Sequence, residues 1–128
     1  MDFRPDRLIT LGDKYQIKRV VLNLLDNAIK FSYEGTEIQI NTWIENGKAH
    51  VSIADVGDGI SDDDLKNVFD RFFKTDKSRA KDKTGAGLGL SLVQNIIRLH
   101  NQQITVKSDT IKDSNARLTT FEFTLEVK

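Results

Sequence analysis

The longest periodic segment of the chain follows Asp13, and its apolar residues recur at spacings of three and four. They are Ile17, Val20, Val21, Leu24, Leu25, Ala28 and Ile29. This spacing places them on one face of a helix, and Asp13 is a typical N-cap residue. We therefore predict a helix over residues 14–31 that ends before Ser32 and Gly35. A helix with one apolar face must bury that face against another layer of structure.

Alternating apolar residues predict that the other layer is a sheet. Residues 37–44 alternate, and Asn46-Gly47 is a strong signal for a two-residue hairpin loop. Ala49, Val51 and Ile53 continue the alternation on the return strand. Further strands are predicted at residues 8–11, 103–108 and 118–127. In the last strand Phe121, Phe123, Leu125 and Val127 share a face.

Two more helices complete the predicted fold. Ser61 followed by three aspartates indicates an N-cap and acidic first turn for a short helix reaching about Phe69. Another helix is predicted after Gly89, with Leu92, Val93, Ile96, Ile97 and Leu99 as its apolar residues. Residues 75–84 are polar, basic and aperiodic, which predicts a long mobile loop. The expected fold is α+β: a two-layer α/β sandwich with a mixed, mostly antiparallel sheet and helices on one face.

Composition bounds what this fold can do. The 128 residues suit one domain spanning residues 1–128, and 19 basic residues balance 19 acidic ones. A net charge of zero gives no support for a nucleic-acid binder. The absence of cysteine excludes disulfides, zinc thiolates and a cysteine nucleophile. No apolar run approaches the ~20 residues that span a bilayer, and the first residues lack a signal-peptide core.

Asn23, Asn27 and Lys30 lie four and three residues apart, so they form one polar stripe on the first helix. Carboxamide oxygens can hold a metal ion, and an ammonium can hold a phosphate. Taken alone, the stripe is more typical of a solvated surface.

Two glycine clusters flank the basic loop. Asp55, Gly57 and Gly59 form D-x-G-x-G after a strand, where an acid can accept a hydrogen bond from an exocyclic amine. Residues 85–89 form G-x-G-x-G before a helix, where free N–H groups favour a phosphate. A basic loop, not a strand, precedes the second cluster, and Leu90 follows it in place of a Walker lysine. Dinucleotide-binding and Walker motifs are therefore disfavoured.

In this order, "NLLDNAIKFS", "DVGDGI", "VFDRFFKTDKSR" and "TGAGLGLSLVQNIIRLH" resemble the N box, first glycine box, F box and second glycine box of sensor histidine kinases. The resemblance extends from about Gly12 to Phe123. It implies a Bergerat-type pocket, with ATP and Mg²⁺ as cofactors. The sequence departs from the family at "HNQQI" (residues 100–104) and "SDTIKDSNARLTTF" (residues 108–121), outside the nucleotide motifs.

The resemblance also implies roles for single residues. Asn27 matches the Mg²⁺ ligand, Asn23 a polar residue near phosphates and metal, and Lys30 a phosphate contact. Asp55 matches the acid that reads the adenine amino group. Other matches are Phe31 and Ile60 as walls of the base pocket, Gly57 and Gly59 in the first glycine box, Lys74 and Arg79 as phosphate-contacting cations, and Gly85, Gly87, Leu88 and Gly89 as a backbone cradle. Asn23, Asn27, Lys30 and Lys74 are the candidate catalytic residues. For the F-box aromatics Phe69 and Phe72 we favour a packing role.

The family further implies a phosphoacceptor histidine on a separate dimerisation domain. His50 lies in a predicted strand and His100 at a helix end, where a positive charge is favourable. A structural role is favoured for both. The expected partners are therefore that His-bearing domain and a response regulator. We expect the isolated domain to be monomeric, and the parent a homodimer anchored in the bacterial inner or plasma membrane with this domain in the cytoplasm.

Two alternatives stay open at this point: a nucleotide-sensing module without transfer activity, and a serine kinase of the anti-sigma type. Related chaperone, topoisomerase and mismatch-repair ATPases carry a glutamate at the position of Asn23. Asparagine cannot act as a general base. This difference favours a kinase over a fast ATPase, and it also disfavours the anti-sigma type.

Overall fold

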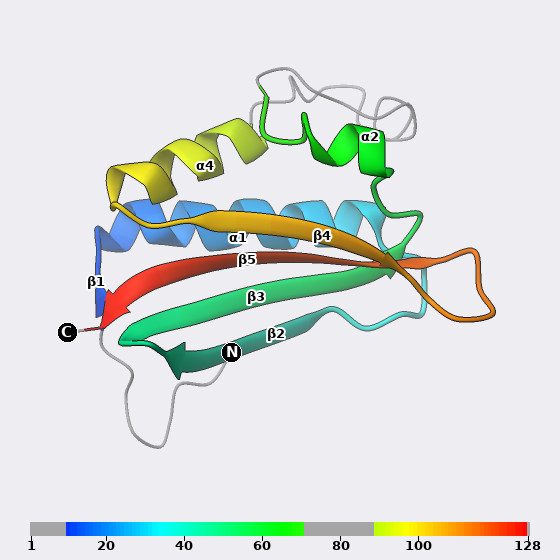
Figure 1. Ribbon diagram of the computed structural model, residues 1–128, viewed down its shortest axis with the longest axis horizontal. Helices are drawn as coiled ribbons and strands as arrows, with labels where there is room; N and C mark the ends of the chain where they lie inside the picture. The colour runs from blue at the N-terminus through cyan, green and yellow to red at the C-terminus, as the bar shows by residue number, and fades with distance from the viewer. Residues whose placement is uncertain (1–9, 71–88, 128) are drawn as a thin grey trace.

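The computed structural model of the chain describes residues 10–70 and 89–127, and Figure 1 shows its elements. In chain order they are β1 (Thr10–Leu11), α1 (Lys14–Phe31), β2 (Gln39–Glu45), β3 (Lys48–Gly57), α2 (Asp62–Leu65), α4 (Gly89–Leu99), β4 (Ile104–Thr110) and β5 (Arg117–Val127).

The first helix has the predicted bounds. The Asp13 carboxylate accepts hydrogen bonds from the N–H groups of Tyr15 and Gln16, which confirms the N-cap. At the other end Ser32 is extended, with φ −75° and ψ 150°, so α1 stops at Phe31. Because Val20, Leu24 and Ala28 are buried, the predicted apolar face of α1 meets the sheet, but Ile29, predicted on the same face, is 65% exposed.

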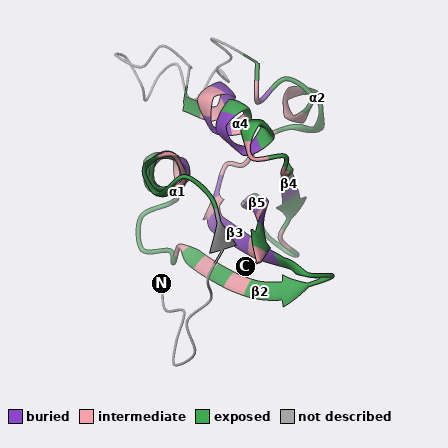
Figure 2. Cartoon of the chain, turned by 90° about the vertical axis from the view of Figure 1, so that its left-hand side faces the viewer, coloured by how far each residue is buried: buried purple, intermediate pink, exposed green. Residues whose placement is uncertain are grey.

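The sheet has the strand order β1-β5-β3-β2, and β4 also pairs with β5. β4 lies along Arg117–Phe123, whereas β1 pairs with Glu126 and Val127, so β1 and β4 occupy successive parts of β5. Every described strand pair is antiparallel. Figure 2 shows α1 and α4 on one side of the curved sheet. The predicted α+β sandwich with helices on one face is confirmed.

The loop between β2 and β3 has the predicted hairpin geometry. Glu45 pairs with Lys48, which leaves only two residues in the loop. These residues, Asn46 and Gly47, have φ values of 53° and 74°. Positive φ at both central positions matches the right-handed twist of the flanking strands, and Asn-Gly adopts it at low cost.

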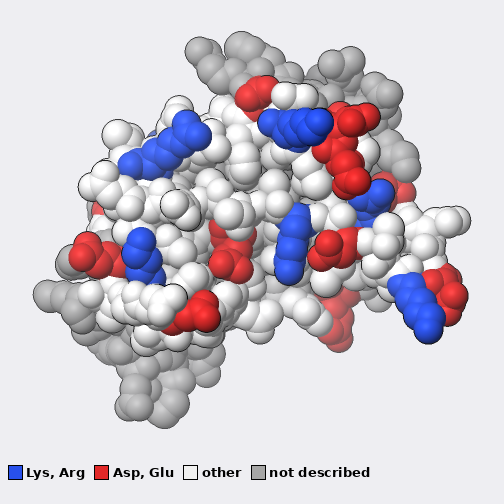
Figure 3. All heavy atoms as spheres, in the orientation of Figure 1, with Lys and Arg blue, Asp and Glu red and all other residues white. Residues whose placement is uncertain are grey.

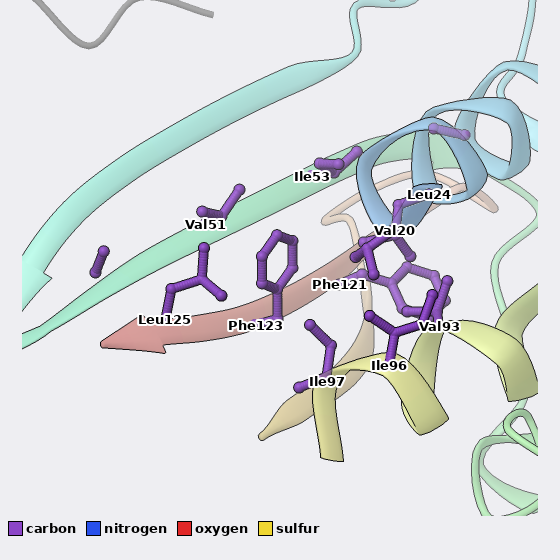
Figure 4. Close-up of a cluster of buried hydrophobic side chains, with 12 residues drawn as sticks. Val20, Leu24, Val51, Ile53, Val93, Ile96, Ile97, Phe121, Phe123 and Leu125 are labelled. Carbon is purple, nitrogen blue, oxygen red and sulfur yellow. The ribbon is translucent and has the colours of Figure 1, made fainter. Parts of the chain in front are cut away.

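One hydrophobic core joins the two layers. Figure 4 shows side chains of β3 and β5 facing those of α1 and α4. The buried members are Val20, Leu24, Ala28, Ala49, Val51, Ile53, Val93, Ile96, Ile97, Phe121, Phe123 and Leu125. The predicted inward face of the last strand is confirmed, with Val127 partly buried at its end. Burying one such large side chain contributes about 1.5–3 kcal/mol.

The two later helices differ in detail from the prediction. Ser61 caps α2 through the N–H of Asp64 as predicted, but α2 ends at Leu65 and the chain reaches Phe69 through turns. In α4, Leu99 is 83% exposed, contrary to its expected place on the apolar face. One residue later, His100 turns back towards the body of the domain.

The contacts of His100 support the structural role expected for it. Its Nδ1 lies 2.8 Å from the carbonyl oxygen of Ile96, and its Nε2 accepts from the N–H of Asp13 at 2.9 Å. A neutral imidazole protonated at Nδ1 satisfies both bonds. His100 therefore joins the end of α4 to the start of α1.

His50 lies on the sheet face that carries no described helix. Its Nδ1 is 3.1 Å from Glu122 Oε2. Its ring stacks on Trp43 with centroids 5.2 Å apart and planes inclined by 11°. These contacts support the structural role expected for His50.

Candidate nucleotide site

The carboxyl ends of α1 and β3 meet, and this junction brings the predicted N box and first glycine box together (Figure 1). Ser32 and Gly57 form an isolated antiparallel bridge, and the N–H of Tyr33 donates to the carbonyl of Val56 at 2.8 Å. A Cβ on Gly57 would lie 2.1 Å from the Phe31 carbonyl oxygen. Glycine at position 57 is thus required by contact with α1, whereas the sequence pattern suggested close approach of a ligand.

The Asn23 carboxamide of the polar stripe lies beside the start of α4. Asn23 and Asn27 are partly buried. A Cβ on Gly89 would lie 3.9 Å from Asn23 Oδ1, so the N box faces the first residue of α4. Gly89 is the one member of the predicted phosphate cradle that the described residues include.

Lys30 extends the stripe into solvent. Its Nζ lies 3.3 Å from Asp26 Oδ2, one helical turn earlier, and the two side chains are 40% and 65% exposed. Exposed pairs of this kind contribute only a few tenths of a kcal/mol. The ion pair with Asp26 is therefore a weak competitor for an anionic ligand at Lys30.

Asp55 is the most unusual ionisable group of the junction. It is only 7% exposed, and burial raises its pKa from 3.8 to about 6. Within residues 10–70 and 89–127 no hydrogen bond or ion pair reaches its carboxylate. A buried acceptor is costly unless a donor meets it. The geometry therefore suits a ligand that brings its own N–H donor to Asp55.

The loop from Asp58 to Ile60 is held from two sides. On the α1 side, the Tyr33 hydroxyl donates to Asp58 Oδ1, and this bond raises the pKa of Tyr33. On the other side, the N–H of Ile60 donates to Ser108 Oγ at 3.0 Å, and Arg117 Nη1 donates to the Ile60 carbonyl at 3.0 Å.

Sequence reasoning missed Ser108, Thr119 and Arg117. Ser108 and Thr119 are buried with their hydroxyl oxygens 2.9 Å apart, and Thr119 pairs with Asp55 across β3 and β5. These three residues belong to the stretch where the sequence departs from the family pattern. A useful signal was available there: a serine and a threonine at inward-facing strand positions otherwise occupied by apolar residues.

The two departing turns have ordinary geometries. Asn101, at φ 59°, follows α4 in the left-handed conformation, and the N–H of Gln102 donates to the Ile97 carbonyl at 3.0 Å. This is a Schellman C-cap, in which asparagine replaces the usual glycine. In the β4–β5 turn, Asp113 has φ 60° and Ser114 Oγ accepts from the N–H of Ala116 at 3.0 Å.

Several predicted site residues lie outside the described residues: Lys74, Arg79, Gly85, Gly87 and Leu88, together with the loop 75–84 and Phe72. Phe69 is described. Its ring meets that of Phe121 edge-on, with centroids 6.2 Å apart, which supports the packing role. The described charges of both signs are interspersed on the face drawn in Figure 3, in line with the zero net charge.

Comparisons with known proteins agree with this architecture. Residues 12–128 match the family described as "Histidine kinase-, DNA gyrase B-, and HSP90-like ATPase". The signal transduction histidine-protein kinase ArlS of Staphylococcus aureus (strain USA300) is 36% identical over 104 residues, which is 81% of this chain and 23% of ArlS. The chain therefore spans about a quarter of that relative's length.

Solved structures of histidine kinases share the fold of this chain. The mycobacterial sensor histidine kinase MprB superposes with a TM-score of 0.82 at 31% identity, over 93% of this chain and 77% of that one. The catalytic domain of the histidine kinase ThkA gives 0.72 at 29% identity, over 90% and 68% of the two chains.

The fold and the junction of N box and glycine box thus define an α+β domain of the ATPase type. The chain belongs to the histidine kinase-, DNA gyrase B- and HSP90-like ATPase family, and within it to the ATP-binding domains of sensor histidine kinases. No described helix combines the length and apolarity needed to cross a bilayer.

Proposed function

We propose that this domain binds Mg·ATP and donates the γ-phosphate to a histidine on a separate dimerisation domain, in two-component signal transduction. The observation that carries the proposal is Asp55, a buried carboxylate without a described protein donor, next to the N box. Adenine presents an exocyclic amino group that satisfies such an acceptor, whereas guanine presents a carbonyl at the same position.

The protein residues around this acceptor have complementary chemistry. Phe31 ends α1 and Ile60 follows the glycine box, and both are partly buried. We assign them as walls of the base subsite. Lys30 and the N-terminus of α4 at Gly89 would then face the phosphates, where a cation and unpaired helical N–H groups favour anions.

The donors present suit Mg²⁺ held jointly with a nucleotide. No cluster of three His, Cys, Asp or Glu side chains able to hold a metal occurs among the described residues. The oxygens of Asn27 and Asn23 are hard neutral ligands, and Mg²⁺ commonly takes few protein ligands plus phosphate oxygens and waters. When bound, the ion would neutralise charge on the transferring phosphoryl group.

The residues also suit transfer better than rapid hydrolysis. Asn23 has no proton-accepting group in the physiological range, so the site lacks a general base for water there. His50 and His100 are held by Glu122 and by Asp13 and Ile96, respectively. The acceptor would therefore be a histidine of another domain. We propose a homodimeric, membrane-anchored parent and a response regulator as the further partner.

The two alternatives predict different outcomes. A nucleotide-sensing module would bind Mg·ATP without transfer, and an anti-sigma-type enzyme would modify serine. The latter is disfavoured by Asn23, where an acid is expected. A helix bearing His followed by Glu or Asp, encoded upstream of this domain, would favour the histidine kinase.

The test mixes this chain with its candidate His-bearing helical domain and γ-labelled ATP. We expect acid-labile label on that domain with wild type, and its loss with Asn27→Ala, which removes a metal ligand. Asn95→Ala, on the exposed side of α4, is the matched control and should transfer as wild type does. Equal transfer by Asn27→Ala and wild type would refute the metal assignment. Mg·ATP binding without any transfer would favour the sensing module.

A further inference from the structure

Ile60 lies in the first glycine box, just after β3. Its backbone is held by the β4–β5 hairpin and not by β3. Both backbone polar groups of Ile60 bond to this hairpin: the N–H to Ser108 Oγ and the carbonyl to Arg117 Nη1, each at 3.0 Å. The orientations of the two peptide groups that flank Ile60 are therefore set, and with them the direction of its side chain.

The same two residues shape the turn just before Ile60. Gly59 has φ 75°, and a Cβ there would lie 2.5 Å from Arg117 Cβ and 2.6 Å from Ser108 Oγ. The turn thus packs directly on the stem of Arg117. The guanidinium also donates to the Ser108 carbonyl at 3.3 Å and lies 3.9 Å from Asp62 Oδ1. Because Asp62 is 93% exposed, that ion pair adds little.

Ser108 connects this clamp to the floor of the candidate site. Its hydroxyl lies 2.9 Å from Thr119 Oγ1 in the buried interior, and Thr119 stands opposite Asp55 in the register of β3 and β5. One chain of contacts therefore runs from the acceptor strand, through two hydroxyls, to the backbone of Ile60. Asp55 and Ile60 are held in a fixed mutual position by residues that belong to neither glycine box.

We propose that Ser108 and Arg117 are positioning residues that set the adenine selectivity of this domain by fixing Ile60 relative to Asp55. This inference rests on the proposed function, since it presupposes that Ile60 and Asp55 form the base subsite. The hydrogen bonds of both residues go to the base side of the proposed site, through the Ile60 backbone, Thr119 and the Ser108 carbonyl. Loss of the clamp should therefore affect recognition of the base more than of the triphosphate.

The experiment measures displacement of a fluorescent ATP analogue from the 128-residue chain by ATP and by GTP. Wild type should prefer ATP by roughly tenfold or more. Arg117→Met keeps the stem under Gly59 but removes the donor to Ile60. It should weaken ATP binding about five- to tenfold, change GTP binding less, and so reduce the ratio. Arg117→Lys, which retains one donor, should recover part of the ratio, and Ser108→Ala should reproduce the loss.

Lys107→Met is the matched control, because it removes a neighbouring positive charge from an exposed position of β4. If Arg117→Met weakened ATP and GTP equally, or if folded Arg117→Met and Ser108→Ala kept the wild-type ratio, the positioning role would be refuted. Circular dichroism confirms folding in each case. A wild type that binds no ATP would instead refute the proposed function itself, and the inference with it.

Discussion

A single buried carboxylate links recognition to stability at the residue scale. Burial raises the pKa of Asp55 from 3.8 to about 6, so the folded state holds this proton more tightly than the unfolded chain does. The contribution of Asp55 to stability is therefore most favourable below pH 3.8. It is lost as the pH rises towards 6, and above that pH the ionised group destabilises the fold.

Asp55→Asn should accordingly stabilise the ligand-free domain more at pH 8 than at pH 4.5. From the two pKa values, the difference between mutant and wild-type unfolding free energies should grow by on the order of 1–2 kcal/mol between these pH values. Urea unfolding at both pH values measures it. Asp109→Asn, on the exposed part of β4, controls for the loss of one negative charge. A pH-independent difference for Asp55→Asn would show that the pKa of Asp55 is not raised in the folded state.

At the scale of elements, the joint between α1 and β3 depends on the missing side chain of Gly57. A Cβ there would meet the Phe31 carbonyl at 2.1 Å, and backbone atoms cannot move aside as a flexible side chain can. Gly57→Ala should therefore destabilise the domain by about 2 kcal/mol or more and weaken ATP binding, since it shifts the N box relative to Asp55.

Gly35→Ala is the matched control for that change. No atom lies within 4 Å of the Cβ position of Gly35, but its φ is 83°. Gly35→Ala therefore measures the cost of backbone strain without a clash, which is about 1–2 kcal/mol. Chemical denaturation and nucleotide titration of both variants separate the two effects. ATP affinity that stays at the wild-type value in folded Gly57→Ala would contradict a role for this joint in the site.

The elements themselves were largely predictable because their signals are local. The spacing of Val20, Leu24 and Ala28, the Asp13 cap and the Asn46-Gly47 turn each act within a few residues, and each was confirmed. Contacts between elements were not predictable in the same way. Nothing near Arg117 or Ser108 in the sequence indicates Ile60, which lies 57 and 48 residues away.

The difference between local signals and contacts between distant elements also explains where the sequence-based predictions were incomplete. The sequence pattern after Ser61 predicts a helix that reaches Phe69, but α2 ends at Leu65 and Phe69 packs on Phe121. The structural role expected for His100 is supported, but its place at a helix end does not indicate its partner Asp13, which lies 87 residues earlier. In the first case a tertiary contact overrides a local preference. The assigned roles of Asn23, Asn27 and Lys30 stay predictions until nucleotide binding is measured.

On the scale of the whole molecule, the site and the core connect the same parts. Buried side chains of α1, α4, β3 and β5 form one cluster, so neither layer has a core of its own. The proposed site likewise joins α1, the end of β3 and the start of α4. Unfolding should consequently be a single transition, and a bound nucleotide should stabilise every element together.

Thermal unfolding followed by far-ultraviolet circular dichroism and by Trp43 fluorescence tests this expectation, because the two signals report the helices and the helix-free face of the sheet. The two curves should coincide. Mg·ATP at about a hundredfold excess over its Kd should add about 2.7 kcal/mol, which raises the Tm on the order of 10 °C for a domain of this size. Mg·GTP at the same concentration should raise it less. If nucleotide shifted the circular dichroism curve alone, the helices and the sheet would not share one cooperative core, and the site would belong to the helical layer only.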